Sequence, residues 1–239
     1  QQTCDAGAEL ICTDVRRVDP AEKRVETAAG DFTAPAMILA TGAEPRRLGI
    51  PGEERFRGRG VSYCASCDGF FYRGREVYVV GGGNSAGEEA LHLAALASRV
   101  HILVRGGSMR CDDATARQLR ETPNLSVELH RALREIRGGE AIETLLIEDT
   151  ASGAVSAVAA EGAGVFIFIG YRPASDLLAG ALDMDENGYL LTDESLQTNI
   201  PGVFAAGDVR RKALRQIVTA AADGALAAVQ ACKFLQNMV

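Results

Sequence analysis

The residues Glu76-Val77-Tyr78-Val79-Val80 run directly into Gly81-Gly82-Gly83-Asn84-Ser85-Ala86. This pattern predicts a buried strand, a glycine turn and a helix whose first backbone N–H groups can hold a pyrophosphate. Gly81 permits the tight turn, Gly83 lets the backbone approach the phosphates, and Ala86 lets the helix pack on the strand. Taken alone, the pattern also fits an ordinary glycine-rich turn. A second apolar strand after the helix completes a β-α-β unit, which favours nucleotide binding.

Apolar runs and helical spacing alternate along the rest of the chain. We expect strands at residues 9–15, 24–27, 36–40, 76–80, 100–104 and 165–169, helices at 86–97, 112–120 and 216–234, and a hairpin or meander within 126–149. Ser85 is the expected N-cap of the first helix. The run at 36–40 is apolar throughout, which predicts a strand buried on both faces. Strands that alternate with helices at glycine turns predict an α/β fold with largely parallel sheets.

A pair of cysteines precedes the glycine turn, in Cys64-Ala65-Ser66-Cys67-Asp68-Gly69, with Cys67 14 residues before Gly81. Cysteines at this spacing can close a small disulfide and exchange it with another protein. Asp68 is the only titratable residue close to them in sequence and is the candidate acid–base. Two small packed hydrophobes are the alternative reading of the cysteines. A zinc site would need further Cys or His ligands at short spacing, so we expect no metal.

The end of the predicted strand at 100–104 indicates which nucleotide would bind. An NAD site usually carries Asp or Glu about 20 residues after the glycine turn, to hold the ribose 2′-hydroxyl. This chain has Arg105 there and Arg110 close behind. Guanidinium groups suit a 2′-phosphate, which favours NADPH, although both arginines could instead be solvated surface residues. The dithiol and the nucleotide turn together predict a disulfide reductase driven by a nicotinamide cofactor.

Composition excludes several other functions. The chain has 239 residues, 47% of them apolar, a net charge of −7 and a pI of about 5.1, which disfavours nucleic acid or an anionic membrane surface as a partner. Six cysteines are too few for a secreted disulfide framework. We expect no signal peptide and no apolar run near the ~20 residues of a membrane span. The expected location is the cytoplasm.

Several segments together resemble the low-molecular-weight thioredoxin reductases, which are flavoproteins. They follow that family's order over essentially the whole chain. The matching residues are Cys64–Gly69, Gly81–Ala86 with Glu88-Glu89, Ala40-Thr41-Gly42-Ala43-Glu44-Pro45, Phe168-Ile169-Gly170-Tyr171-Arg172-Pro173, Val203-Phe204-Ala205-Ala206-Gly207-Asp208 and Arg215-Gln216. The resemblance implies two Rossmann-like nucleotide-binding domains, with an NADPH domain at residues 48–172 inserted into an FAD domain split between 1–47 and 173–239.

The resemblance also implies roles for individual residues. FAD would be contacted by Thr41, Gly42, Gly207, Asp208, Arg215, Gln216 and Ile217, and NADPH by Gly81, Gly83, Asn84, Ser85, Ala86, Arg105, Arg110, Ile169 and Gly170. Cys67 would face the flavin and Cys64 would attack the partner's disulfide, with Asp68 moving the proton. The implied function is thioredoxin-disulfide reductase, with electrons passing from NADPH through FAD and Cys64–Cys67 to thioredoxin or a thioredoxin-like protein. The family's working form is a homodimer, which we expect here too.

The chain departs from the family pattern in three ways. No FAD pyrophosphate loop precedes Gln1, so we expect a chain truncated at its N-terminus that by itself holds FAD weakly or not at all. Gly106 stands where the family usually has a second arginine, and Gly87 replaces a larger apolar residue. Two alternatives therefore stay open. One is a flavin-free NADPH-binding fragment without activity, and the other is a flavin disulfide reductase fed by another donor such as ferredoxin.

Overall fold

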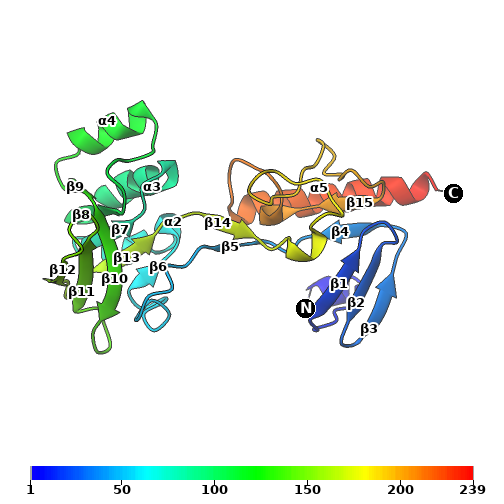
Figure 1. Ribbon diagram of the computed structural model, residues 1–239. Coiled ribbons are helices and arrows are strands. Elements are labelled where there is room, and N and C mark those ends of the chain that lie inside the picture. Colours follow the sequence, from blue (N-terminus) through cyan, green and yellow to red (C-terminus); the bar gives the residue numbers. More distant parts are fainter. Residues whose placement is uncertain (1, 239) are drawn as a thin grey trace. The chain divides into compact units, whose positions relative to one another are not determined.

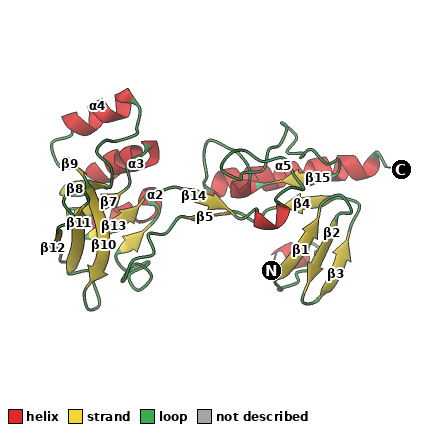
Figure 2. Cartoon of the chain, viewed as in Figure 1, coloured by secondary structure: helices red, strands yellow, loops and turns green. Residues whose placement is uncertain are grey.

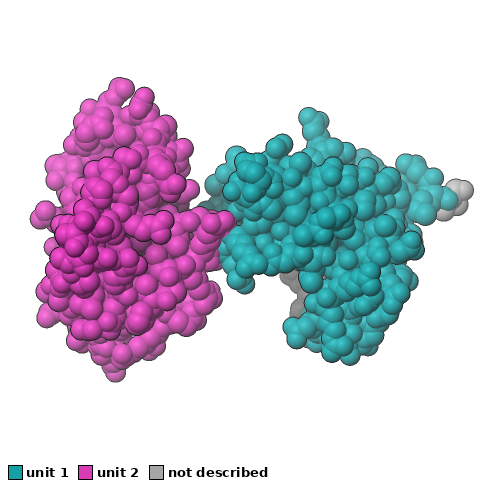
Figure 3. All heavy atoms as spheres, viewed as in Figure 1, with its two compact units in different colours: residues 1–44, 172–239 teal, residues 45–171 magenta. Residues whose placement is uncertain are grey.

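The computed structural model describes residues 2–238, which form two compact units (Figure 3). Unit 1 combines residues 1–44 with 172–239, and unit 2 consists of residues 45–171. Unit 2 is therefore inserted into the sequence of unit 1. The boundaries expected from the sequence, after residues 47 and 172, lie within a few residues of these divisions. The chain passes between the units in β5 (Ala43–Pro45) and β14 (Tyr171–Pro173), which pair with each other.

A parallel sheet forms the centre of unit 2 (Figure 1). Its strands lie in the order β6 (Val61–Ser62), β13 (Gly164–Ile167), β7 (Glu76–Val80), β8 (Arg99–Val104) and β9 (Leu125–Leu129). Strand β7 is buried from its second residue onward because both faces of the sheet are covered. This is why its sequence is apolar without alternation.

Two different layers cover the faces of that sheet (Figure 2). On one face, α3 (Asn84–Ala94) and α4 (Asp113–Glu121) pack through a core that includes Ala90, Leu93 and Leu119. On the other face lies an antiparallel sheet of β10 (Arg131–Arg137), β11 (Thr144–Asp149) and β12 (Val155–Ala159), whose core residues include Leu133 and Leu145. The expected hairpin within 126–149 is confirmed as β10 and β11, and residues 125–129 join the parallel sheet instead.

Unit 1 contains two small sheets and one long helix. The antiparallel sheet consists of β1 (Val15–Asp19), β2 (Arg24–Thr27) and β3 (Gly30–Thr33), and β4 (Met37–Leu39) pairs in parallel with β15 (Val203–Ala205). Helix α5 (Ile217–Gln236) packs Ala227 and Ala231 against Phe204 of β15. Shorter helical segments are α1 (Gln2–Asp5), α2 (Ala65–Asp68) of unit 2, and the 3-10 turns η1 (Gly69–Tyr72), η2 (Asp176–Leu178) and η3 (Gly207–Val209).

Three sequence predictions about these elements are wrong. The strand expected at 9–15 begins only at Val15, and Leu10 is 72% exposed. Strand β4 is not buried on both faces, because Ile38 is 41% exposed between buried Met37 and Leu39. The expectation of no apolar run near membrane-spanning length also fails. Helix α5 has 20 residues and a mean hydropathy of 1.3 in its most apolar window, enough by length and composition to cross a membrane, with 17% of that window buried.

The close approach of Gly52 to β10 gives a test of packing in unit 2. Gly52 has a φ of +88°, and a Cβ atom there would lie 2.0 Å from the Ile136 carbonyl oxygen. We expect Gly52→Ala to lower the free energy of unfolding by about 3 kcal/mol or more. The alanine would be strained at this positive φ, and the backbone of β10 would also have to move away from its Cβ. The matched control is Gly58→Ala, where φ is +71° but nothing lies within 4 Å, and where we expect a loss of about 1–2 kcal/mol. Urea unfolding of both variants measures this, and equal losses would contradict the packing argument.

Candidate active site

A cavity of about 890 Å³ opens at the carboxyl ends of the parallel strands of unit 2. It is lined by the ends of β7 and β8, the glycine turn, the segment 168–170 after β13, residues 131–134 of β10 and residues 46–50. The turn cannot carry a side chain at Gly81, where φ is +153° and a Cβ would lie 2.3 Å from the Phe168 carbonyl oxygen. Ligands of parallel α/β sheets bind at this end of the strands.

The N-terminus of α3 faces this cavity without a side-chain cap. Its N-cap residue is Gly83 rather than the predicted Ser85, and no side chain bonds to the N–H groups of the first turn. Asn84 instead accepts a hydrogen bond from the Asp112 N–H at 2.8 Å, which joins the start of α3 to the start of α4. Uncapped N–H groups and the positive end of an eleven-residue helix form an anion site.

Arginines supply the charge of the cavity. Arg105 follows β8, and Arg110 is held against the turn by a 2.6 Å hydrogen bond from its N–H to the Gly82 carbonyl. Neither side chain forms an ion pair or hydrogen bond with another residue in the range 2–238. Four further arginines line the cavity and were not predicted: Arg46, Arg47, Arg131 and Arg134. No Asp or Glu side chain is among the described lining residues, so the cavity suits a polyanionic ligand.

The residues that the resemblance assigns to NADPH therefore share one cavity. All of them line it: Gly81, Gly83, Asn84, Ser85, Ala86, Arg105, Arg110, Ile169 and Gly170. Gly170 has a φ of +102° and accepts the Arg46 N–H at 2.9 Å. The four additional arginines could not be found from the sequence, because the sheet register and the segment 45–50 bring them there.

The cysteine pair lies elsewhere in unit 2. Cys64 and Cys67 form a disulfide with a Cα–Cα distance of 5.3 Å, which confirms the predicted redox-active pair. Cys64 is the N-cap of α2, and its sulfur accepts the Cys67 N–H at 3.2 Å and contacts the Ser66 hydroxyl at 3.4 Å. Cys67 is the more exposed of the two. Hydrogen-bond donors around a sulfur stabilise a thiolate, and both of these contacts lie at Cys64.

Asp68 is connected to Cys64 through Ser62. The Ser62 hydroxyl donates to Asp68 Oδ2 at 2.6 Å and accepts the Cys64 N–H at 3.1 Å. The Asp68 N–H donates to the Cys64 carbonyl at 3.2 Å. The carboxylate is therefore fixed beside the backbone of Cys64.

A buried carboxylate near the dithiol was missed by the sequence reasoning. Glu53 is 3% exposed and accepts the Leu48 N–H at 3.0 Å, the Gly49 N–H at 2.7 Å and the Tyr63 hydroxyl at 2.7 Å. Burial and this contact raise the pKa of Tyr63 far above its usual range. Glu53 thus connects the segment that lines the cavity to the residue preceding Cys64. The only sequence signal was an acidic residue after Pro51-Gly52, which is typical of a surface turn.

The residues assigned to FAD follow two adjacent parallel strands in unit 1. Thr41 and Gly42 come after β4, and Gly207 and Asp208 come after β15, with the Ala206 N–H donating to the Leu39 carbonyl at 2.9 Å. Thr41 donates to the Ala174 carbonyl at 2.6 Å. The register of β4 and β15 therefore places both turns at one edge of the sheet.

Two polar atoms of unit 1 are buried without a hydrogen-bond partner among the described residues: Asp208 Oδ1, in the turn after β15, and Arg215 Nε, just before α5. The Arg215 guanidinium lies over the Tyr189 ring at 4.0 Å. Buried polar atoms are nearly always hydrogen-bonded in proteins, so an unpartnered pair indicates a missing ligand or water. An acceptor and a donor fit the hydroxyl and phosphate groups of a dinucleotide, which is the fit expected for FAD. Gln216 and Ile217 follow Arg215; Ile217 is 90% exposed and Gln216 caps α5.

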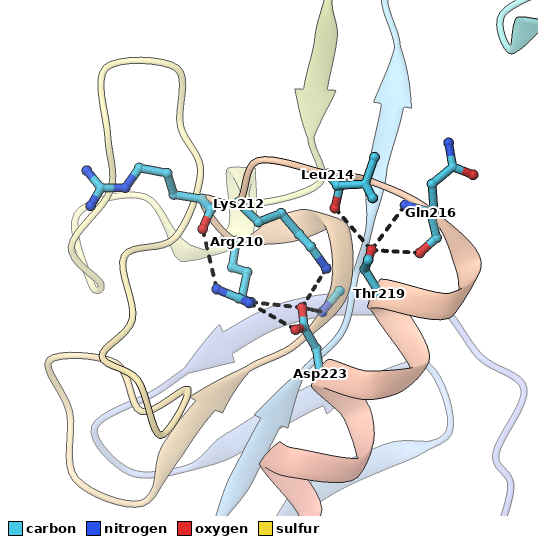
Figure 4. A network of polar contacts seen from close by, with 8 residues as sticks. Arg210, Lys212, Leu214, Gln216, Thr219 and Asp223 are labelled. Carbon is cyan, nitrogen blue, oxygen red and sulfur yellow. Dashed lines mark hydrogen bonds and ion pairs between the residues drawn. The ribbon is translucent and has the colours of Figure 1, made fainter. Parts of the chain in front are cut away.

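A charged network supports the Gly207 turn (Figure 4). Asp223 of α5 accepts the Gly207 N–H at 3.0 Å, the Lys212 ammonium at 2.7 Å and two nitrogens of Arg210 at 2.8 and 2.9 Å. Burial by itself raises the pKa of Asp223, but the hydrogen bonds from Arg210 and Lys212 outweigh it and lower the pKa to about 2. The three side chains are mostly buried. Beside them, Thr219 accepts the Gln216 N–H and donates to the Leu214 carbonyl, which fixes the start of α5.

Comparison with known proteins agrees with this chemistry. The family model of the pyridine nucleotide-disulphide oxidoreductases matches residues 2–224. Thioredoxin reductases from Peptoclostridium litorale and Treponema pallidum are 41% and 40% identical to the chain over its whole length, and the chain covers 78% and 77% of them. The solved thioredoxin reductase of Streptococcus pyogenes has a TM-score of 0.88 at 36% identity, over 99% of this chain and 78% of that one.

The redox disulfide and the paired nucleotide folds thus define a flavin- and nicotinamide-linked class of enzymes that reduce disulfides. Within that class, the chain belongs to the thioredoxin reductase family. The predicted fold class, α/β with two Rossmann-like domains of which one is inserted into the other, is confirmed.

The acid stability of unit 1 tests the Asp223 network. Because the pKa of Asp223 in the folded chain is about 2, below its ordinary 3.8, its contribution is complete above pH 3.8 and is lost as the pH falls towards 2. We expect Asp223→Asn to lower the free energy of unfolding at pH 7 by about 3–5 kcal/mol, since Arg210 and Lys212 stay buried without their partner. The control Asp176→Asn removes an exposed ion pair with Arg172 and should cost less than about 1 kcal/mol. Urea unfolding between pH 7 and 3 measures both, and equal costs would contradict this role.

Proposed function

We propose that the cavity of unit 2 binds NADPH, that the β4 and β15 edge of unit 1 binds FAD, and that Cys64–Cys67 passes electrons to thioredoxin or a thioredoxin-like protein. One observation carries the proposal: unit 2 contains both the disulfide and the cavity. The cavity combines the uncapped N-terminus of α3 with the unpaired side chains of Arg105 and Arg110. When bound, NADPH would supply a hydride and FAD would supply two-electron transfer between that hydride and the disulfide.

The protein's own residues carry the remaining steps. Two electrons and two protons convert the Cys64–Cys67 disulfide into two thiols, and Asp68 gives and takes a proton beside them. The Cys64 thiolate then attacks one sulfur of the partner's disulfide and releases the other as a thiolate. Cys67 attacks the Cys64 sulfur of this mixed disulfide, which frees the reduced partner and restores the original disulfide.

Two alternatives are less well supported. A flavin-free nucleotide-binding fragment would have no use for the buried, unpartnered Asp208 Oδ1 and Arg215 Nε. Electron supply by another donor, such as ferredoxin, would leave the basic cavity of unit 2 without a ligand. We further propose a cytoplasmic homodimer that binds neither nucleic acid nor membrane, which sedimentation velocity of the purified chain tests for the dimer.

An assay of thioredoxin reduction tests the function as a whole. The purified chain with excess free FAD should reduce thioredoxin disulfide at the expense of NADPH, and Cys64→Ser should abolish this turnover. Nucleotide binding by Cys64→Ser should be unchanged, because Cys64 does not line the cavity. Turnover retained by Cys64→Ser would show that the electrons take another route.

The two thiols should differ in reactivity. In the variant Cys67→Ser, Cys64 is the remaining thiol of the pair and keeps hydrogen-bond donors around its sulfur. In the variant Cys64→Ser, Cys67 is the remaining thiol. The alkylation of Cys64 by iodoacetamide should reach half its maximal rate at a lower pH than the alkylation of Cys67. Peptide mass spectrometry separates these sites from Cys4, Cys12, Cys111 and Cys232. The reverse order of the two pH profiles would exchange the roles of the two sulfurs. This measurement needs no flavin.

The cavity should prefer NADPH to NADH. Isothermal titration should show tighter binding of NADPH, because the side chains of Arg105 and Arg110 have no partner among residues 2–238 and can contact the 2′-phosphate. Arg105→Gln should weaken NADPH about tenfold and leave NADH nearly unchanged, since only the 2′-phosphate contact is lost. Equal affinities of the unmodified chain for the two nucleotides would contradict the assignment.

A further inference from the structure

The loop after β8 is short of positive charge at the place where a 2′-phosphate would lie. In a β-α-β nucleotide site, the ribose of the adenosine half lies at the end of the second strand. Here that strand is β8, and Arg105 is followed by Gly106 and Gly107. A Cβ built on Gly106 meets nothing nearer than the Ser108 carbonyl oxygen at 4.0 Å. Residues 105–107 therefore offer one guanidinium and an open space beside it, and the next arginine of the loop, Arg110, is held at the glycine turn by the hydrogen bond from its N–H to the Gly82 carbonyl.

The turn between β9 and β10 is fixed against this loop. The His130 N–H donates to the Gly106 carbonyl at 3.0 Å, and the Thr150 hydroxyl donates to the Arg105 carbonyl at 2.9 Å. His130 has a φ of 57°, and its ring lies 3.0 Å from where a Cβ of Gly107 would be. These contacts hold the residue that follows His130 next to the loop.

That residue is Arg131, which lines the same cavity. Its Nη1 donates to Asp149 Oδ2 at 2.5 Å, and Asp149 is itself held by the N–H groups of Ala151 and Ser152 at 3.0 Å. One nitrogen of the guanidinium is thus anchored, and its side chain is 38% exposed. A guanidinium has five N–H donors in a planar fork, so an anchored Arg131 retains donors for a phosphate.

The other arginine on β10 is less suited to this role. Arg134 lies at the register shift between Leu133 and Glu135, pairs with Glu148, and has a side chain that is 52% exposed. No hydrogen bond connects its neighbours to the loop 105–107 among the described residues. Arg131 is therefore the better-placed second cation.

We propose that Arg131 is a specificity-determining residue of the nucleotide site, which contacts the 2′-phosphate from β10 together with Arg105. This inference rests on the proposed NADPH function of the cavity. If it holds, the antiparallel sheet of unit 2 and the loop after β8 together distinguish NADPH from NADH.

Adenosine 2′,5′-bisphosphate and adenosine 5′-monophosphate are the probes, because they differ only in the 2′-phosphate and need no flavin. Titration of the purified chain should show tighter binding of the bisphosphate. Arg131→Gln should weaken the bisphosphate about tenfold and leave the monophosphate within about twofold. The matched control is Arg99→Gln, which removes the same charge at the amino end of β8 and should change neither affinity.

A rescue variant separates a direct contact from a structural effect. The open space at Gly106 admits a side chain, so Gly106→Arg in the Arg131→Gln background should restore most of the lost bisphosphate affinity. In the unmodified background, Gly106→Arg should add less, because Arg131 already supplies the second cation. Unchanged monophosphate binding in every variant shows that the cavity is intact.

The outcomes distinguish the inference from the proposed function. An unmodified chain that binds neither probe, or binds both equally, would overturn the NADPH assignment and this inference together. A chain that prefers the bisphosphate, and keeps its full preference in Arg131→Gln, would overturn only the role of Arg131. Equal weakening of both probes would show that Arg131 supports the cavity and does not read the 2′-phosphate.

Discussion

The approach of the Gly81 backbone to the end of β13 is the contact on which the cavity of unit 2, the proposed nucleotide site, depends. The Phe168 N–H donates to the Val80 carbonyl at 2.8 Å, and the Gly81 N–H donates to the Leu103 carbonyl at 3.2 Å, so three strands end together. A side chain at Gly81 would separate them. Because the strands end together, the start of α3, the loop after β8 and the segment 168–170 converge on one cavity. The arginines of the cavity and the N-terminus of α3 then favour an anionic ligand.

Unit 1 positions its turns by a different force. There the Gly207 N–H is held by a buried carboxylate, whose own charge is balanced by two buried cations. Such a network is expensive to break and gives the turn a single conformation. Asp208 and Arg215, whose buried Oδ1 and Nε atoms have no partner among the described residues, are adjacent in sequence to Gly207 and Gln216. A fixed turn that presents unsatisfied polar atoms is what a dinucleotide site requires.

The fold gives the two cysteines of the dithiol different surroundings. Cys64 and Cys67 have the same chemistry in the sequence, but folding makes Cys64 the N-cap of α2 and leaves Cys67 more exposed. Ser62 connects Asp68 to Cys64, and Glu53 holds Tyr63 immediately before it. The difference between the two sulfurs thus arises from the Cys67 N–H and the Ser66 hydroxyl, which the turn of α2 brings to the Cys64 sulfur.

Local patterns were sufficient to predict the parallel strands β4, β7, β8 and β13, the longer helices, the hairpin, the disulfide and the residues of the glycine turn, because each depends on neighbours within a few positions. The parallel strands β6, β9 and β15 were not predicted as such. Local patterns failed at residues 9–15, at Ser85 and at Ile38, where pairing, capping and burial depend on distant partners.

Gly87 is a clear case. A glycine inside a helix is unfavourable for the helix itself, but a Cβ at Gly87 would lie 2.6 Å from the Thr115 side chain, so the glycine lets α4 pack against α3. The sequence by itself determined the fold class, the dithiol and the nucleotide turn. Only the tertiary structure decided which arginines share a cavity, which carboxylates are buried and which sulfur accepts hydrogen bonds. Those properties depend on strand register that no local pattern records, and on residues far apart in the sequence, as in the hydrogen bond from Arg46 Nε to the Tyr171 carbonyl across 125 positions.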